Sequence, residues 1–314
     1  MSGDQVRLYH EDPIEDAEAA GQLLGMATRR SVLTGGAALA AGGIFSGLLA
    51  ESAAAQGGTR GSGVLREPRE QTPPLEIFQI AAIAEQLAIT FYSNGVRNAD
   101  ALGLDGIDLD IIKAAGIEEQ IHQRFFTAVI GLLTGRRAPR TVGPTTFSFP
   151  FPNTFTDLPT FLATQQALEG VFDSAFLAAI RELSRQKQHR AAQIAGQIAT
   201  IESEHRALGL DIAVRNGIEA LPNPAEDLLR GRFNPRPSNP QPNPFPTSPP
   251  DNWAFAPVFL ESVGDAPALV QRAGFLSPRG RNSFRYRPID FTSSTYASVF
   301  ENIFFREPTI NLGT

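Results

Sequence analysis

Two Glu-x-x-His units, Glu119–His122 and Glu202–His205, constrain this 314-residue chain more than any other feature of its sequence. A glutamate precedes each unit at nearly the same spacing: Glu85 lies 34 residues before the first, and Glu169 lies 33 residues before the second. Residues three apart in a helix project from one face, so each unit presents a carboxylate and an imidazole together. Four carboxylates and two imidazoles on four helices can hold two metal ions in the core of a bundle.

The helical faces around these residues favour an inward position. Phe78, Ala81, Ala82, Ala88 and Ile89 share a helical face with Glu85, and a carboxylate on an apolar stripe is costly to bury unless it is paired or bound to metal. The alternative is a set of solvated surface glutamates and histidines. We take six residues as candidate metal ligands: Glu85, Glu119, His122, Glu169, Glu202 and His205. Tyr92 and Asp173 are weaker candidates for side chains that orient these ligands; core packing is the alternative for Tyr92, and a surface or capping role for Asp173.

Four helical segments are predicted between residues 73 and 217. The first runs from about Pro73 to Asn98 and is followed by a polar turn from Asp100 to Gly106. The second runs from Asp108, as N-cap, to Thr134, with Gly135 as its stop signal. The third starts near Asp157, and the fourth covers roughly Gln188 to Asn216.

The connections between these segments predict the topology. The first and second helices are joined by a short turn, as are the third and fourth, so each pair forms an antiparallel hairpin. The connection from Gly135 to Thr156 is long enough, at roughly 3.3 Å per residue, to run the length of a helix. We therefore expect an all-α fold, a four-helix bundle with one long crossover.

The residues outside the bundle differ in composition. Residues 56–72 are rich in glycine and charge, which predicts a flexible linker. Residues 222–250 are dominated by proline and cannot form a regular helix. The aromatic residues that follow predict that the extension 218–314 is an irregular, Pro-rich segment wrapped on the bundle or on a neighbouring subunit; a disordered tail is the alternative.

The N-terminal residues 1–55 have the order of regions found in an export signal. Arg29 and Arg30 precede a mildly apolar stretch rich in glycine and alanine, which ends at a small-residue cleavage site around Ala55. The Arg pair resembles a twin-arginine signal. A chance Arg pair before a weak membrane anchor is the alternative. We expect export by the twin-arginine machinery to the periplasm, the cell envelope or the extracellular space, with no stable membrane span after cleavage.

The absence of cysteine excludes disulfides, thiolate metal sites and iron–sulfur clusters. A transition-metal site in this chain must use carboxylate and imidazole, which suit iron, manganese or zinc. The chain has a formal net charge of −6, and most of that charge lies in the leader, so the nearly neutral remainder gives no electrostatic reason to expect nucleic-acid binding.

With its six ligand positions matched, the region from about Pro73 to Gly217 resembles the ferritin-like superfamily, and most closely its exported members with a twin-arginine leader. The resemblance implies two iron or manganese ions, with zinc as a further option. Relatives store iron, oxidise ferrous ion, or react with peroxide or oxygen. Rubrerythrin-like peroxidases need a cysteine-ligated iron that this chain cannot supply, and the long tail is foreign to cage-forming ferritins. The tail resembles the extension of manganese catalases.

Two functions are compatible with these features of the sequence. The first is a dimetal-carboxylate oxidoreductase acting on ferrous ion, oxygen or peroxide, as a homo-oligomer. The second is a non-catalytic envelope or stress protein, similar to desiccation-related relatives, in which the metal only braces the fold.

Overall fold

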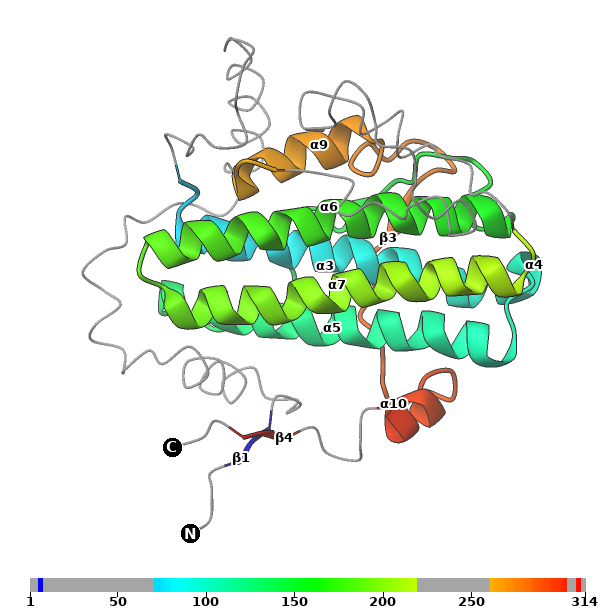
Figure 1. The fold of residues 1–314 in the computed structure, drawn as a ribbon, viewed down its shortest axis with the longest axis horizontal. Helices are drawn as coiled ribbons and strands as arrows, with labels where there is room; N and C mark the ends of the chain where they lie inside the picture. The colour runs from blue at the N-terminus through cyan, green and yellow to red at the C-terminus, as the bar shows by residue number, and fades with distance from the viewer. Residues whose placement is uncertain (1–4, 8–70, 219–259, 304–308, 312–314) are drawn as a thin grey trace, which may run out of the picture.

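A computed structural model describes residues 5–7, 71–218, 260–303 and 309–311. Most of the predicted signal, Arg29 and Arg30 included, nearly all of the predicted linker and the whole proline-rich stretch 222–250 lie outside the described residues. Helices and strands are labelled as in Figure 1.

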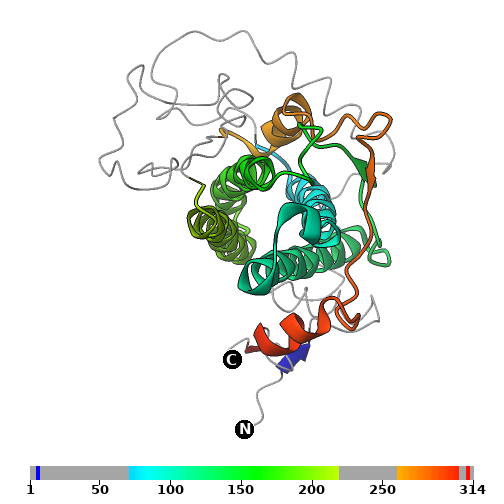
Figure 2. The same cartoon turned by 90° about the vertical axis from the view of Figure 1, so that its right-hand side faces the viewer.

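Four long helices form a bundle. They are α3 (Pro74–Arg97), α5 (Gly106–Thr134), α6 (Leu158–Arg185) and α7 (His189–Arg215). The most extensive contacts join α3 to α5 and α6 to α7, so the two predicted hairpins are present. Viewed along the bundle, the four helices surround one axis (Figure 2). The predicted all-α bundle with one long crossover is confirmed.

Glycine and aspartate mark the helix ends. Gly135 ends α5 in the left-handed conformation, with φ at 64°, which a residue without Cβ adopts at little cost. Asp157 caps α6 by accepting a hydrogen bond from the Thr160 backbone N–H at 3.0 Å. Both ends were predicted from the sequence. Gly217 likewise follows α7 with φ at 67°.

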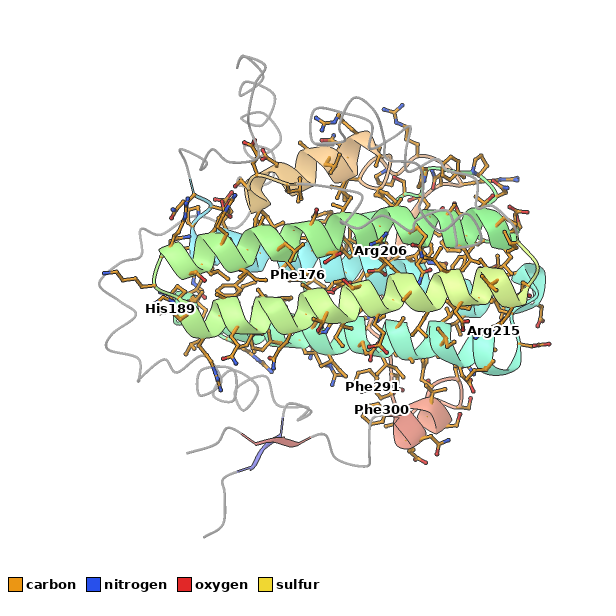
Figure 3. All side chains as sticks on the ribbon, viewed as in Figure 1. Phe176, His189, Arg206, Arg215, Phe291 and Phe300 are labelled. Atoms are coloured by element: carbon orange, nitrogen blue, oxygen red, sulfur yellow. The ribbon has the colours of Figure 1, made fainter. Side chains whose placement is uncertain are left out.

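The start of α5 was placed wrongly by the sequence. The residue preceding the helix is Asp105, not Asp108. Asp108 lies inside the first turn, where its carboxylate accepts hydrogen bonds from Arg215 Nε (2.9 Å) and Asn216 Nδ2 (2.7 Å) at the end of α7; Figure 3 labels Arg215 there. An aspartate in a first turn also suits the helix dipole. The local sequence was therefore compatible with Asp108 either as the N-cap or inside the first turn.

The predicted polar turn between the first two helices contains a short helix, α4 (Ala99–Leu102). Ala99 and Leu102 are both buried and lie three residues apart, on one face of a helical turn. Their burial against the core explains why the segment coils instead of forming an open turn.

The crossover between α5 and α6 pairs with the C-terminal extension. Strand β2 (Thr146–Phe147) lies antiparallel to β3 (Phe284–Arg285), and Figure 2 shows the two segments side by side outside the bundle. The sequence predicted an extended crossover but not this pairing, because a two-residue strand is defined only by its distant partner.

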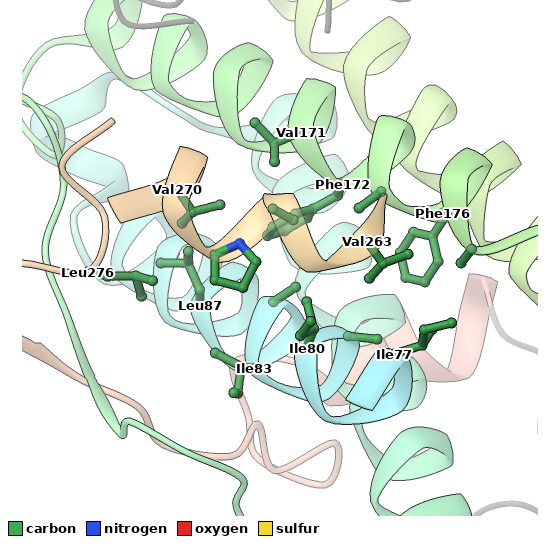
Figure 4. Close-up of a pocket in the computed structure, with 16 residues that line it drawn as sticks. Ile77, Ile80, Ile83, Leu87, Val171, Phe172, Phe176, Val263, Val270 and Leu276 are labelled. Carbon is green, nitrogen blue, oxygen red and sulfur yellow. The ribbon is translucent and has the colours of Figure 1, made fainter. Parts of the chain in front are cut away.

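The described part of the extension packs on the bundle. A single turn η2 (Val263–Asp265) leads into α9 (Ala266–Arg272), which lies over α3 and α6. The two helices and α9 enclose a small apolar cavity of about 50 Å³, lined by side chains such as Ile80, Phe172 and Val270 (Figure 4).

Further along the extension, α10 (Ala297–Ile303) lies against α5. Phe300 of α10 stacks on Phe291, with ring centroids 4.8 Å apart (Figure 3). Strand β4 (Thr309–Asn311) pairs antiparallel with β1 (Gln5–Arg7). The described part of the extension therefore contacts the bundle through η2, α9 and α10, and it contains short helices as well as irregular chain; the predicted wrapping of the whole extension stays a prediction.

Helix α3 is the most apolar part of the described chain. It is the one described helix that is long and apolar enough to cross a membrane, but 78% of its most apolar window is buried inside the bundle. That burial is the property expected of a core helix. Glu85 occupies the middle of this helix and is itself fully buried.

Candidate metal centre

All six predicted ligands converge in the middle of the bundle, and each of the four helices contributes at least one. Glu85 comes from α3, Glu169 from α6, and the two Glu-x-x-His units from α5 and α7. Two overlapping groups have ligand atoms within 4.8 Å of one another: Glu85, Glu119, His122 and Glu202 in one, and Glu119, Glu169, Glu202 and His205 in the other.

The two groups share two residues, and each of the other four candidate ligands belongs to one group only. Glu119 and Glu202 belong to both groups and lie between them. Glu85 and His122 complete one group, whereas Glu169 and His205 complete the other. The near-equal spacing in the sequence therefore corresponds to a nearly symmetric arrangement in space.

The cluster is almost completely shielded from solvent. All four carboxylates have exposed fractions of 0%, and His205 is 1% exposed. The His122 side chain is 12% exposed and is the ligand closest to solvent by this measure. Four carboxylates in so dry a site would be strongly unfavourable without compensating positive charge or protons.

Distances within the cluster suit a shared ion better than direct pairing. His122 Nδ1 lies 3.8 Å from Glu85 Oε2, 3.7 Å from Glu119 Oε2 and 3.8 Å from Glu202 Oε1. Donor atoms bound to one transition-metal ion at about 2.1 Å are separated from each other by about 3 to 4 Å. The observed separations fall in that range.

His205 makes a similar set of contacts. Its Nδ1 lies 3.0 Å from Glu119 Oε1, 3.8 Å from Glu169 Oε1 and 3.7 Å from Glu202 Oε2. The shortest of these is within hydrogen-bond distance, yet neither atom has a hydrogen-bond partner of acceptable geometry. Both atoms are therefore without a hydrogen-bond partner although they lie close together.

Buried polar atoms without hydrogen-bond partners are concentrated in this cluster. Both carboxylate oxygens of Glu85, Glu119 and Glu202, the Oε2 of Glu169 and the Nδ1 of both histidines lack a partner. Native proteins leave few buried polar atoms unsatisfied, and each such atom needs an explanation. A cation that accepts these lone pairs provides one, so the residues present fit a metal ion, and oxygen and imidazole donors suit iron, manganese or zinc.

Burial and the repulsion between neighbouring carboxylates change the pKa values of these groups. Burial, reinforced by neighbouring carboxylates, raises the pKa of Glu85 and of Glu202 well above the usual range. Burial also acts to raise the pKa of Glu119, but the close approach of Glu85 and both histidines to its carboxylate outweighs burial and holds that pKa far below its usual value. Without metal, the cluster would therefore retain protons on some carboxylates and charge on others.

Tyr92 lies beside the cluster, as the sequence suggested. Its hydroxyl donates a hydrogen bond to Glu169 Oε1, and burial followed by the Glu169 charge raises the pKa of the phenol. Gln165 donates to the Tyr92 oxygen at 3.1 Å and to the backbone carbonyl of His205 at 3.0 Å. These contacts hold the Glu169 carboxylate and the part of α7 that carries His205.

Asp173 is buried one turn after Glu169 but faces a different partner. Its Oδ2 lies 4.0 Å from Arg206 Nη1, and burial raises the pKa of its carboxyl group, opposed by Arg206 and Ser203. Among the described contacts, Asp173 therefore pairs α6 with α7 and does not hydrogen-bond a candidate ligand.

Glu118 is the residue beside the cluster that sequence reasoning missed. Its Oε2 lies 2.8 Å from Nε2 of His205, on the side of the ring opposite the cluster. Adjacent helical residues point about 100° apart, so the inward position of Glu119 argued against a role for its neighbour. The Glu118-Glu119 doublet was the available signal, but its meaning depends on how α5 packs against α7.

Comparison with known proteins agrees with this geometry. Residues 74–213 match the family model described as "Ferritin-like domain"; the match covers less than half of the 314-residue chain but includes all six candidate ligands. The bundle of this chain is thus similar to a ferritin-like domain in sequence and in helical arrangement. No curated protein matches the chain, and no solved structure matches it.

Proposed function

We propose that the chain is a dimetal-carboxylate protein that carries out redox chemistry on ferrous ion, oxygen or peroxide. The convergence of otherwise unsatisfied oxygen and nitrogen atoms in a dry core carries this proposal. Two divalent ions would balance four carboxylates, whereas a single ion would leave a net negative charge in a site that solvent does not reach.

The overlapping residue groups suggest how the ions would be held. Glu85 and His122 would help to hold one ion, Glu169 and His205 would help to hold the other, and Glu119 and Glu202, which belong to both groups, would contribute to both. When bound, iron or manganese ions would supply reversible one-electron redox steps to oxygen or peroxide. The absence of cysteine means that no thiolate centre within the chain can deliver electrons.

The protein side chains would control protons, orientation and water. Tyr92 can hold a proton at its hydroxyl oxygen next to Glu169, and its raised pKa keeps that proton in place at neutral pH. Glu118 and Gln165 hold the ring and the backbone of His205. The apolar faces of α3 and α6 exclude bulk water, so small reactants suit the centre better than large ones.

The test is turnover by metal-loaded protein. Ferrous oxidation and peroxide consumption would be measured for the wild type and for the double variant Glu119→Ala plus Glu202→Ala, with Glu204→Ala as an exposed control on α7. We expect activity in the wild type and control, and loss in the double variant. Bound metal with no turnover would overturn the redox proposal in favour of the structural brace; zinc as the native metal would do the same.

We also propose that the protein is exported in folded form through the twin-arginine route. The Arg29-Arg30 pair, the apolar stretch after it and the small residues near Ala55 support this. A folded route suits a buried metal centre, because the ions can be loaded before transport. Replacing both arginines by lysine should leave the protein in the cytoplasm during fractionation; unchanged export would contradict the proposal.

A further inference from the structure

Two segments of the chain carry arginine and no acidic residue. Residues 120–156 contain four arginines, and residues 266–289 contain five, with no aspartate, glutamate or lysine in either. The whole chain, by contrast, has a net charge of −6. Positive charge is therefore concentrated in two stretches that are far apart in the sequence.

The fold brings these two stretches together. Strand β2 of the crossover pairs with β3 of the extension, and the Tyr286 backbone N–H donates to the Thr145 carbonyl at 2.9 Å. Gln120 and Gln123 on α5 hydrogen-bond each other and hold both stretches: Gln120 accepts from the Ile289 backbone at 2.9 Å, and Gln123 donates to the Arg140 carbonyl at 3.3 Å.

Residues 279–287, here called the arginine ribbon, present four guanidinium groups to solvent. Arg279, Arg281, Arg285 and Arg287 are all exposed, whereas Tyr286 is only 5% exposed. Alternate residues of an extended chain point to opposite sides, so Tyr286 anchors the ribbon inward while its two neighbours face outward.

The backbone of the ribbon is fixed by specific contacts. Asn282 pairs with the backbone of Phe149 through two hydrogen bonds, accepting from its N–H at 2.9 Å and donating to its carbonyl at 2.7 Å. Arg279 and Asn282 also exchange backbone hydrogen bonds at 3.0 Å. The arginines thus extend from an ordered turn, which lowers the entropy lost when they bind a partner.

The charges of the ribbon are not neutralised within the described part of the chain. None of its four guanidinium groups forms an ion pair there. Arg136, Arg137 and Arg140, in the adjoining crossover, are exposed as well. Seven exposed arginines in two paired segments of an otherwise acidic chain indicate an anionic partner.

We propose that the arginine ribbon is a docking surface for membranes rich in anionic phospholipid. Guanidinium groups bind phosphate oxygens in bidentate geometry, and each basic residue near an anionic bilayer adds to its attraction. Nucleic acid is disfavoured, because the aromatic rings here are packed inward, Phe147 and Phe149 being fully buried, and so cannot stack on bases. The ribbon also lacks a helix to enter a groove.

The test is co-sedimentation of the full-length protein with lipid vesicles at low salt. One set contains phosphatidylcholine alone, and the other contains phosphatidylcholine mixed with phosphatidylglycerol. We expect binding only to the anionic vesicles, weakened by added salt. The variant Arg285→Gln plus Arg287→Gln should bind about 30-fold more weakly, the factor expected for two surface arginines.

A matched control removes the same charge elsewhere. Arg185→Gln plus Arg190→Gln changes two exposed arginines near the α6–α7 turn and should leave vesicle binding within about twofold of the wild type, because only residues near the bilayer contribute to the attraction. Thermal melting and metal content should be unchanged in both double variants, which separates this proposal from that of the metal centre. Equal loss in both variants, binding to neutral vesicles, no vesicle binding, or tighter binding to duplex DNA than to anionic vesicles would each overturn it.

Discussion

The ring of His205 is held from both sides. Its Nδ1 faces Glu119 and its Nε2 lies 2.8 Å from Glu118 Oε2. A carboxylate in this position fixes the orientation of a metal-binding imidazole and raises its basicity. Glu118 would therefore act on a bound metal by positioning His205 rather than as a ligand itself.

Glu118→Gln should weaken metal binding by about 10- to 100-fold, the usual effect of removing such a partner. Competition with a chelator measures this affinity directly. Glu204→Gln, an exposed change on α7, is the matched control and should leave the affinity unaltered. Equal affinities for Glu118→Gln and the wild type would show that the observed contact has no role in metal binding.

The metal-free cluster should respond to pH in a defined direction. Burial raises the pKa of Glu85 and Glu202, and acidic neighbours led by Tyr92 raise that of His205 although burial opposes it. These groups hold protons more tightly when folded, so the free energy of unfolding falls as pH rises above their unfolded pKa values of about 4.3 and 6.5. The depressed pKa of Glu119 acts in the opposite sense, but only at more acid pH.

The melting temperature of chelator-treated protein should therefore fall between about pH 5 and pH 8. Glu85→Gln should raise the melting temperature near pH 8, because it removes one buried negative charge, and should matter little near pH 5. Scanning calorimetry across this range is the measurement. A melting temperature that rises with pH would mean that the carboxylates are not mutually repulsive in the folded state.

At the scale of single elements, α6 and α7 approach closely at Gly209. A Cβ at this position would lie 1.8 Å from Gln165 Oε1 and 3.0 Å from Gln166 Nε2. Gln165 cannot move without losing its hydrogen bonds to Tyr92 and to the His205 carbonyl. Small size at Gly209 thus preserves the contacts that flank the metal centre.

Gly209→Ala should lower the free energy of unfolding by about 1–3 kcal/mol, the penalty for unpaired buried groups. Gly196→Ala on the same helix is the control, since its Cβ would meet only Ile180 Cδ1 at 3.6 Å; it should be neutral or stabilising by up to about 1 kcal/mol. Urea unfolding distinguishes them. Equal effects would show that helix propensity, not the Gln165 contact, governs this position.

Some of these helices, strands and site residues could be predicted from the sequence, and others could not. The four long helices were predictable because apolar periodicity and stop signals such as Gly135 act locally. The convergence of the six candidate ligands was predictable because their spacing is a property of the helices themselves. Helix α4 and the β2–β3 pair were missed, since both depend on tertiary contacts, and Glu118 was missed because its partner lies on another helix.

At the scale of the whole molecule, Glu182 joins three distant parts of the chain. Its buried carboxylate accepts hydrogen bonds from the Thr72 backbone at 3.2 Å, the Ser262 hydroxyl at 2.7 Å and the Val263 backbone at 3.3 Å. It thereby connects the start of α3 and the end of α6 to the extension that carries α9. The contact explains how the extension is held at this end of the bundle.

Glu182→Ala should lower the free energy of unfolding by about 2–4 kcal/mol, because it leaves several buried donors without an acceptor. Limited proteolysis should also cut near residue 262 faster than in the wild type, whereas Glu204→Ala should leave both measurements unchanged. Unaltered proteolysis in Glu182→Ala would mean that apolar packing alone holds the extension.

The metal content of the purified protein tests the proposed centre most directly. Elemental analysis of full-length protein, prepared from its native compartment without added metal, should find two iron or manganese ions per chain. The double variant Glu119→Ala plus Glu202→Ala removes the two carboxylates that belong to both residue groups and should contain almost no metal while remaining helical by circular dichroism. Wild-type protein without stoichiometric metal, or a double variant with the wild-type metal content, would contradict the assignment of the cluster as a dimetal site.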